Sequence, residues 1–91
     1  MWFTYVLRSA VDNGFYIGMT SRLKERIREH NAGINRSTRS RKPFDLVYLE
    51  QFDTRLAARE REKYLKSGIG REFLKRVAAE RLNLGTERKR G

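Results

Sequence analysis

The amino-terminal apolar residues fall into two short runs with β-strand character. Residues 2–8 are rich in aromatic and β-branched side chains, and the apolar pattern resumes over residues 15–19. Between them, Asp12-Asn13-Gly14 is a strong turn sequence. The pattern predicts a β-hairpin, whose register the turn residues alone do not fix.

A helix and a polar segment are predicted next. Leu23 and Ile27 lie one turn apart on the inner side of a helix over about residues 22–31, and Gly33 follows its end. Residues 34–42 show no apolar period and contain four cations. They predict a basic loop.

A third strand and two more helices complete the predicted fold. Residues 44–52 alternate as a strand, a helix capped by Asp53 or Thr54 is expected to run to about residue 66, and apolar residues recur at helical spacing over 73–82. We therefore expect one small α/β (α+β) domain over residues 1–82. Its three-stranded antiparallel-type sheet carries flanking helices in the order β-β-α-β-α-α, and residues 83–91 form a basic, disordered tail.

The composition limits what the chain can be. Its 91 residues, 38% of them hydrophobic, suffice for one domain with a modest core. The absence of cysteine excludes a disulfide framework and a thiolate metal site. No apolar run approaches the roughly 18 to 20 residues of a membrane span, and the amino terminus lacks the order of a secretion signal. We expect a cytoplasmic protein without membrane association.

The charge points to a polyanionic partner. Twenty-one Lys and Arg against eleven Asp and Glu give a net charge of +10, with an isoelectric point near 10.7. Nucleic acid is favoured over anionic membrane, because the helices need their apolar faces for the core. The cations expected to contact nucleic acid are Arg22, Arg36, Arg39, Arg41 and Lys42.

Five residues in a defined order suggest phosphodiester chemistry. Tyr5 and Tyr16 flank the hairpin turn, Arg26 and His30 follow on the next helix, and Glu62 lies further along. A phenol can transfer protons, a guanidinium can neutralise a phosphate, and a carboxylate can hold a metal ion. Taken singly, the tyrosines are more often core aromatics and His30 is better interpreted as a polar cap at the helix end, while Arg26 could be an ordinary exposed helix charge.

Glu62 has two possible partners. It lies four residues after Ala58 and three before Leu65, so it shares the inward-facing stripe of its helix. A carboxylate at such a position needs either a metal ion or a salt bridge, for which Arg59 and Lys66 are available.

The same residues fall into the order of a known family. The motifs, in chain order, are Tyr5, Tyr16-Ile17-Gly18, Arg26, His30, Pro43-Phe44-Asp45-Leu46-Val47-Tyr48 and Arg61-Glu62-Lys63-Tyr64-Leu65-Lys66. This order resembles the GIY-YIG nuclease domain. The likeness is to its small stand-alone bacterial members, which are similar to the amino-terminal nuclease domain of an excinuclease, and it covers residues 2–75.

The resemblance implies a role for each of the five residues. Tyr5 would activate the attacking water, and Tyr16 would orient the water or the scissile phosphate. Arg26 would stabilise charge on the phosphate, and His30 would shuttle a proton or bind phosphate. Glu62 would hold Mg²⁺ or Mn²⁺.

The sequence departs from the family pattern in one motif. Phe3-Thr4-Tyr5 stands where the family name spells Gly-Ile-Tyr, so only the tyrosine is retained. Family nucleases usually carry a separate DNA-binding module, and we expect none here. Targeting is then expected from the basic surface or from a partner protein.

The sequence thus predicts a metal-dependent endonuclease that hydrolyses phosphodiester bonds in DNA, in a structure-specific or repair-related role. RNA is an alternative substrate. The main rival is a non-catalytic nucleic-acid-binding protein on the same scaffold, and a basic protein that binds an acidic partner protein is a third interpretation.

Overall fold

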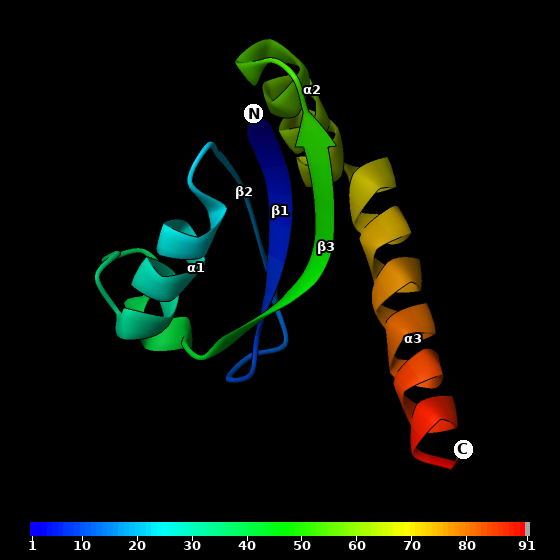
Figure 1. Cartoon of the computed structure of the whole chain (residues 1–91). Coiled ribbons are helices and arrows are strands. Elements are labelled where there is room, and N and C mark those ends of the chain that lie inside the picture. The colour runs from blue at the N-terminus through cyan, green and yellow to red at the C-terminus, as the bar shows by residue number, and fades with distance from the viewer. Residues whose placement is uncertain (91) are drawn as a thin grey trace.

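Three strands and three helices form the molecule, in the order β-β-α-β-α-α that the sequence predicts (Figure 1). The computed structural model describes the backbone of residues 1–90 and the side chains of residues 1–80. The elements are β1 (Trp2–Ser9), β2 (Phe15–Thr20), α1 (Leu23–Ala32), a short 3₁₀ turn η1 (Arg39–Arg41), β3 (Phe44–Phe52), α2 (Arg55–Lys66) and α3 (Gly68–Arg90).

The sheet is antiparallel, with strand order β2-β1-β3. The first strand is therefore central and is hydrogen-bonded on both sides. Tyr5 lies opposite Gly18 of β2, and Leu7 lies opposite Tyr16. Because cross-strand partners share a face and alternate residues repeat it, Tyr5 and Tyr16 are on the same side of the sheet.

Each face of the sheet has its own core, and Figure 1 shows the strands between α1 on one side and α3 on the other. One cluster, formed by Val6, Ile17, Leu65 and Leu74, joins the sheet to α2 and α3. The other contains Tyr5, Leu7 and Phe44, with Leu23 and Ile27 of α1 packed against it. Alternate side chains of β1 thus pack into the two cores in turn, which is why this strand is almost continuously apolar.

The ends of the helices follow local sequence signals. Thr54 accepts a hydrogen bond at its Oγ1 from the Ala57 amide at 3.1 Å and caps α2. Gly33 ends α1 in the left-handed conformation, with φ at 77°. A β1 side chain also fixes α2, because Thr4, fully buried, donates its hydroxyl to the Ala58 carbonyl at 2.8 Å.

The third helix differs from the prediction of 73–82 at both ends. It begins at Gly68, directly after α2, and its helical backbone continues to Arg90. The early start depends on close packing, since a Cβ on Gly70 would collide with the Tyr64 carbonyl. The predicted disordered basic tail over 83–91 concerns residues whose side chains lie outside the described part, so it and the domain boundary at 82 stay predictions. None of the described helices has an apolar stretch that could cross a lipid bilayer.

Candidate active site

Tyr5 is buried in the middle of the central strand, and its hydroxyl lies over the backbone of β2. Only 1% of the residue is exposed. A Cβ built on Gly18 would stand 2.5 Å from the Tyr5 Oη and 2.7 Å from its Cζ. The glycine at the end of the Tyr16-Ile17-Gly18 motif therefore makes the space in which the phenol lies.

His30 meets this phenol from α1. Its Nε2 lies 3.2 Å from the Tyr5 Oη, and its ring centroid is 4.6 Å from that of Tyr16. The imidazole is fully buried. His30 lies in the last turn of α1, and with Tyr5 and Tyr16 it forms one aromatic group on the face of the sheet that α1 covers.

The other nitrogen of His30 is held by the loop after α1, which pattern reasoning did not single out. Thr38, which is 1% exposed, lies with its Oγ1 3.0 Å from the His30 Nδ1. The Asn35 amide nitrogen lies 3.4 Å from the same atom. Nothing in the spacing of residues 34–42 distinguishes Thr38 from the serines beside it, so only the folded chain reveals this contact.

The environment keeps both members of the Tyr5–His30 pair neutral. Burial raises the pKa of Tyr5 to about 12, against the opposing effect of the neighbouring Arg26 guanidinium. Burial lowers the pKa of His30 below its usual value, and the positive charge of Arg26 lowers it further. A neutral phenol therefore faces a neutral imidazole at physiological pH.

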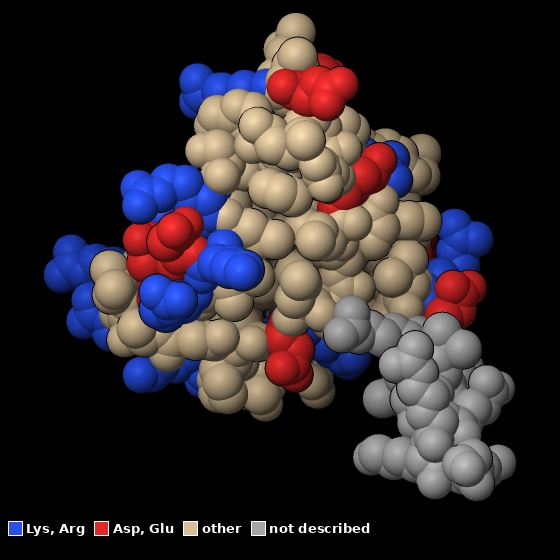
Figure 2. All heavy atoms as spheres, in the orientation of Figure 1, with Lys and Arg blue, Asp and Glu red and all other residues tan. Residues whose placement is uncertain are grey.

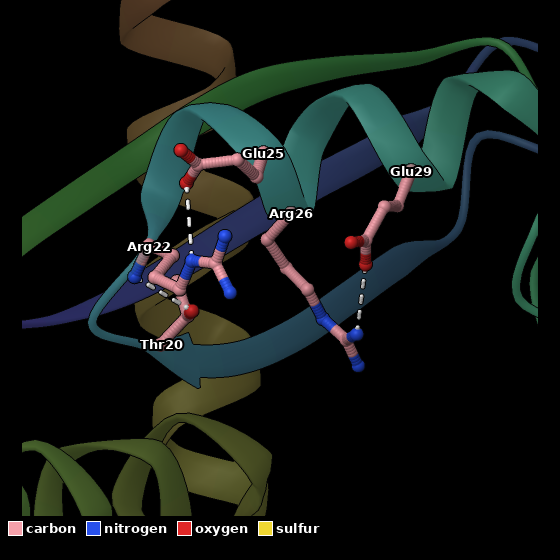
Figure 3. Close-up of a pocket in the computed structure, with 5 residues that line it drawn as sticks. All are labelled: Thr20, Arg22, Glu25, Arg26 and Glu29. Atoms are coloured by element: carbon pink, nitrogen blue, oxygen red, sulfur yellow. Dashed lines mark hydrogen bonds and ion pairs between the residues drawn. The ribbon is translucent and has the colours of Figure 1, made fainter.

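Arg26 borders an open hollow of about 170 Å³ between α1 and the end of β2 (Figure 3). The hollow is lined by Thr20, Arg22, Glu25, Arg26 and Glu29. Figure 3 shows Arg26 extending from α1 toward β2, with its Nη1 3.2 Å from the Glu29 carboxylate. Arg22 is similarly paired with Glu25 at 3.7 Å. Exposed ion pairs of this kind contribute little, so both guanidinium groups can exchange a carboxylate for a phosphate.

Glu62 projects from α2 and remains within electrostatic reach of the phenol. Its charge is among the causes that raise the pKa of Tyr5. The side chain is 16% exposed, and its Oε2 lies 3.3 Å from the Lys66 ammonium. The salt bridge considered as an alternative partner is thus present with Lys66, across an exposed contact that a cation could replace.

Of the loop cations expected to contact nucleic acid, three are exposed and one is bound. Arg36, Arg39 and Lys42 are open to solvent. Arg41 instead holds the hairpin turn, with its Nε 3.0 Å from the Asp12 carboxylate and its Nη2 donating to the Phe15 carbonyl at 3.4 Å. Figure 2 shows Lys and Arg gathered on the side of the molecule that carries α1, around a group of acidic side chains.

Comparison with known proteins agrees with this arrangement. The GIY-YIG catalytic domain matches residues 1–73. The chain belongs to the GIY-YIG catalytic domain family. A UPF0213 protein of Natronomonas pharaonis is 41% identical over 81 residues, covering 88% of this chain and 87% of that protein. A UPF0213 protein of Haloquadratum walsbyi is 44% identical over 66 residues, covering 71% and 73%.

A solved structure supports the fold independently. The solution NMR structure of a UPF0213 protein from Bacillus halodurans superimposes with a TM-score of 0.52 at 31% identity, covering 85% of each chain. The GIY-YIG domain is a nuclease-type domain, its substrate class is nucleic acid, and its members generally use divalent metals.

The chemistry of Glu62 fits the metal of a GIY-YIG nuclease. No group of three or more His, Cys, Asp or Glu side chains that could hold a metal ion occurs within residues 1–80. Mg²⁺ does not require one, since it is bound through one or two carboxylates, keeps several waters and takes up phosphate oxygens. A single partly exposed carboxylate within electrostatic reach of the phenol suits that mode of binding.

Proposed function

We propose that this GIY-YIG protein is a metal-dependent endonuclease that hydrolyses phosphodiester bonds in DNA. The observation that carries the proposal is the contact of 3.2 Å between the Tyr5 Oη and the His30 Nε2, beneath Arg26. This contact gives the phenol a buried proton acceptor. The Arg26 side chain nearby also lines the open hollow, together with the guanidinium group of Arg22.

The hydrogen bonds around His30 support a direction of proton transfer. We assign the tautomer in which the His30 Nδ1–H donates to the Thr38 Oγ1, with the Asn35 side-chain amide turned so that its oxygen, not its nitrogen, faces this N–H. This assignment leaves the Nε2 lone pair to accept from the Tyr5 hydroxyl. Tyr5 then takes a proton from the attacking water while it passes its own proton to His30.

The raised pKa of Tyr5 makes this acceptor necessary. With a pKa of about 12, only about one phenol in 10⁵ is ionised at pH 7. Tyr5 alone would be a negligible base. A relay in which His30 receives the proton as the water is deprotonated avoids a free phenolate.

The remaining residues act on the phosphate. Arg26, with Arg22 beside it, would bind the scissile phosphate and stabilise the charge that develops in the transition state. Tyr16 would orient the water or the phosphate. Glu62 would hold Mg²⁺ or Mn²⁺, which when bound supplies positive charge and lowers the pKa of a water.

The exposed cations support a proposal for the substrate and for how the protein is targeted to it. Exposed arginines and lysines around α1 favour sequence-independent contact with the backbone of DNA. We propose a structure-specific or repair-related substrate in the cytoplasm, with RNA as the alternative substrate and targeting by the basic surface or by a partner protein.

Glu62→Gln tests the proposal, with Glu60→Gln as the matched control on the same helix. Glu60 is exposed and pairs with Lys63 at 4.0 Å, much as Glu62 pairs with Lys66. In an Mg²⁺ titration with supercoiled plasmid and branched DNA, we expect Glu62→Gln to lose cleavage but keep DNA affinity. Glu60→Gln should cut like the wild type.

The rival, a non-catalytic nucleic-acid-binding protein, predicts no Mg²⁺-dependent cleavage by any of the three proteins. Equal cleavage by the wild type and Glu62→Gln, after a contaminating nuclease is excluded, would disprove the role of Glu62.

A further inference from the structure

A second hollow, of about 420 Å³, lies between the hairpin turn and α3. Asn13, Phe15 and Ile17 line it from the hairpin, together with the cations Arg41, Arg71 and Lys75. Ile17 belongs to the core beneath α2 and α3, whereas Tyr5 belongs to the core beneath α1. The hollow is therefore on the sheet face opposite to the candidate active site.

The charge of this hollow suits an anion. Its lining contains three cations and no acid. Arg41 is already oriented by Asp12. Lys75 pairs with Glu72 at 3.4 Å, but both side chains are about two-thirds exposed or more, so the pair is weak. Arg71 takes part in no ion pair among the described side chains.

A buried donor on the same sheet face also lacks an acceptor. Arg8 of β1 lies directly opposite Phe15, so the two share the face on which the hollow opens. The Arg8 Nε is buried without a hydrogen-bond partner among the described residues. A buried unsatisfied donor is costly and rare. Arg8 does not itself line the hollow, so it adds positive charge on this face of the sheet rather than a direct contact.

The size and the aromatic wall indicate which anion fits. Small-molecule sites usually measure about 300 to 1,000 Å³, so a single nucleotide can enter. Phe15 is only partly buried and offers its ring as a wall of the hollow. Aromatic rings beside cations are typical of single-strand sites, where an unpaired base stacks on the ring while the cations hold the backbone.

We propose that this hollow is a second, non-catalytic site that binds one nucleotide of a single DNA strand. Arg71 and Lys75 hold its phosphate, next to Arg41 in its ion pair with Asp12, and its base stacks on Phe15. The inference rests on the proposed function for the identity of the polymer. It narrows the substrate to DNA that carries a single-stranded arm, because a duplex does not expose the face of its bases.

The test compares two double charge reversals, Arg71→Glu with Lys75→Glu and Arg59→Glu with Lys63→Glu. Both pairs are exposed, four residues apart on a helix, and contain a lysine paired with a glutamate three residues earlier. Fluorescence anisotropy would measure the binding of a labelled single-stranded oligonucleotide and a duplex of equal length, over a series of salt concentrations.

We expect the change at 71 and 75 to weaken single-strand binding about tenfold and to flatten the dependence of log K on log salt by about 0.7 for each phosphate that is no longer neutralised. The change at 59 and 63 should have a clearly smaller effect. Duplex binding should respond equally to both. Phe15→Leu, which keeps an apolar residue on the core, should weaken single-strand binding without changing the salt slope.

Equal losses of single-strand binding in the two double variants would overturn the proposal, as would a duplex that loses as much affinity as the single strand at 71 and 75. If charge reversal unfolds the chain by circular dichroism, the corresponding glutamine pairs make the same comparison. The readout is binding, so a wild type without nuclease activity would disprove the proposed function and leave this result intact.

Discussion

At the scale of residues, the candidate site depends on a pair of groups that burial keeps uncharged. Burial raises the pKa of Tyr5 and lowers that of His30, so both shifts favour the neutral form. The pair is in turn fixed by Thr38. Proton transfer can then begin without first removing a charge from either partner.

Thr38→Val tests whether this contact positions the imidazole for the reaction. Valine keeps the shape but leaves the His30 Nδ1–H without its acceptor, which typically costs about 1 to 3 kcal/mol of stability. We expect single-turnover cleavage to fall by at least about tenfold and its pH profile to shift, because the ring is no longer fixed in one tautomer. Thr38→Ser restores the hydroxyl and should recover both.

A merely structural threonine would give a different result. Thr38→Val would then unfold more easily but would cut at the wild-type rate, with an unchanged pH profile, under conditions where it is fully folded.

The lowered pKa of His30 predicts how stability depends on pH. Between the folded-state pKa and the ordinary value of about 6.5, the unfolded chain binds a proton that the folded chain does not. The contribution is therefore complete above about pH 6.5 and is lost as the pH falls below it, by up to about 1.4 kcal/mol per pH unit. Urea unfolding at several pH values measures this slope.

His30→Gln is the control for that measurement, because it removes the titrating ring while keeping a polar side chain. Its stability should change less with pH between about 5 and 6.5. The same slope in both proteins would assign the effect to other groups.

At the scale of elements, β2 has a glycine at the position where any side chain would collide with the Tyr5 phenol of β1. Gly18 is buried and faces Tyr5 across the hairpin. Its neighbour Tyr16 adds a ring to the same site. The short edge strand β2 thus provides both the Tyr16 ring and, at Gly18, the space for the Tyr5 ring.

Gly18→Ala should displace the phenol. The added methyl would lie 2.5 Å from the Tyr5 Oη, and such overpacking typically costs about 1 to 3 kcal/mol. We expect a lower melting temperature together with loss of cleavage. Gly68→Ala is the matched control, since a Cβ there meets nothing within 4 Å. Thermal melts and cleavage assays that show both variants equal to the wild type would disprove the requirement at Gly18.

The sequence predicted those features that repeat along an element. Strand alternation and helical spacing indicated the element order, and Thr54 and Gly33 marked helix ends as expected. The loop contacts could not be predicted, because Thr38 and Arg41 have neighbours of similar chemistry and differ only in what the folded chain places beside them. The start of α3 was missed for a similar reason, since the close approach of Gly70 to α2 leaves no trace in periodicity.

At the scale of the whole molecule, the sheet separates two hollows, one lined by two Arg–Glu ion pairs and the other by three cations. One opens beside α1 and contains Arg22 and Arg26, and the other opens beside α3 and contains Arg71 and Lys75. The edge strand β2 borders both, since Thr20 lines the first and Phe15 the second. A strand of DNA that crosses this edge could contact both faces of one small domain.

The central position of β1 in the sheet also affects how fast its backbone amides exchange hydrogen with solvent. A strand that is hydrogen-bonded on both sides and buried in two cores exposes its amides to solvent only when the whole domain unfolds. Elements that are held mainly by side-chain contacts unfold locally more readily. Hydrogen exchange should therefore be slowest around Tyr5 and faster in α1 and its following loop. The buried phenol and imidazole are therefore expected to keep their places, whereas the partly exposed Arg26 guanidinium is the group that an arriving phosphate can rearrange.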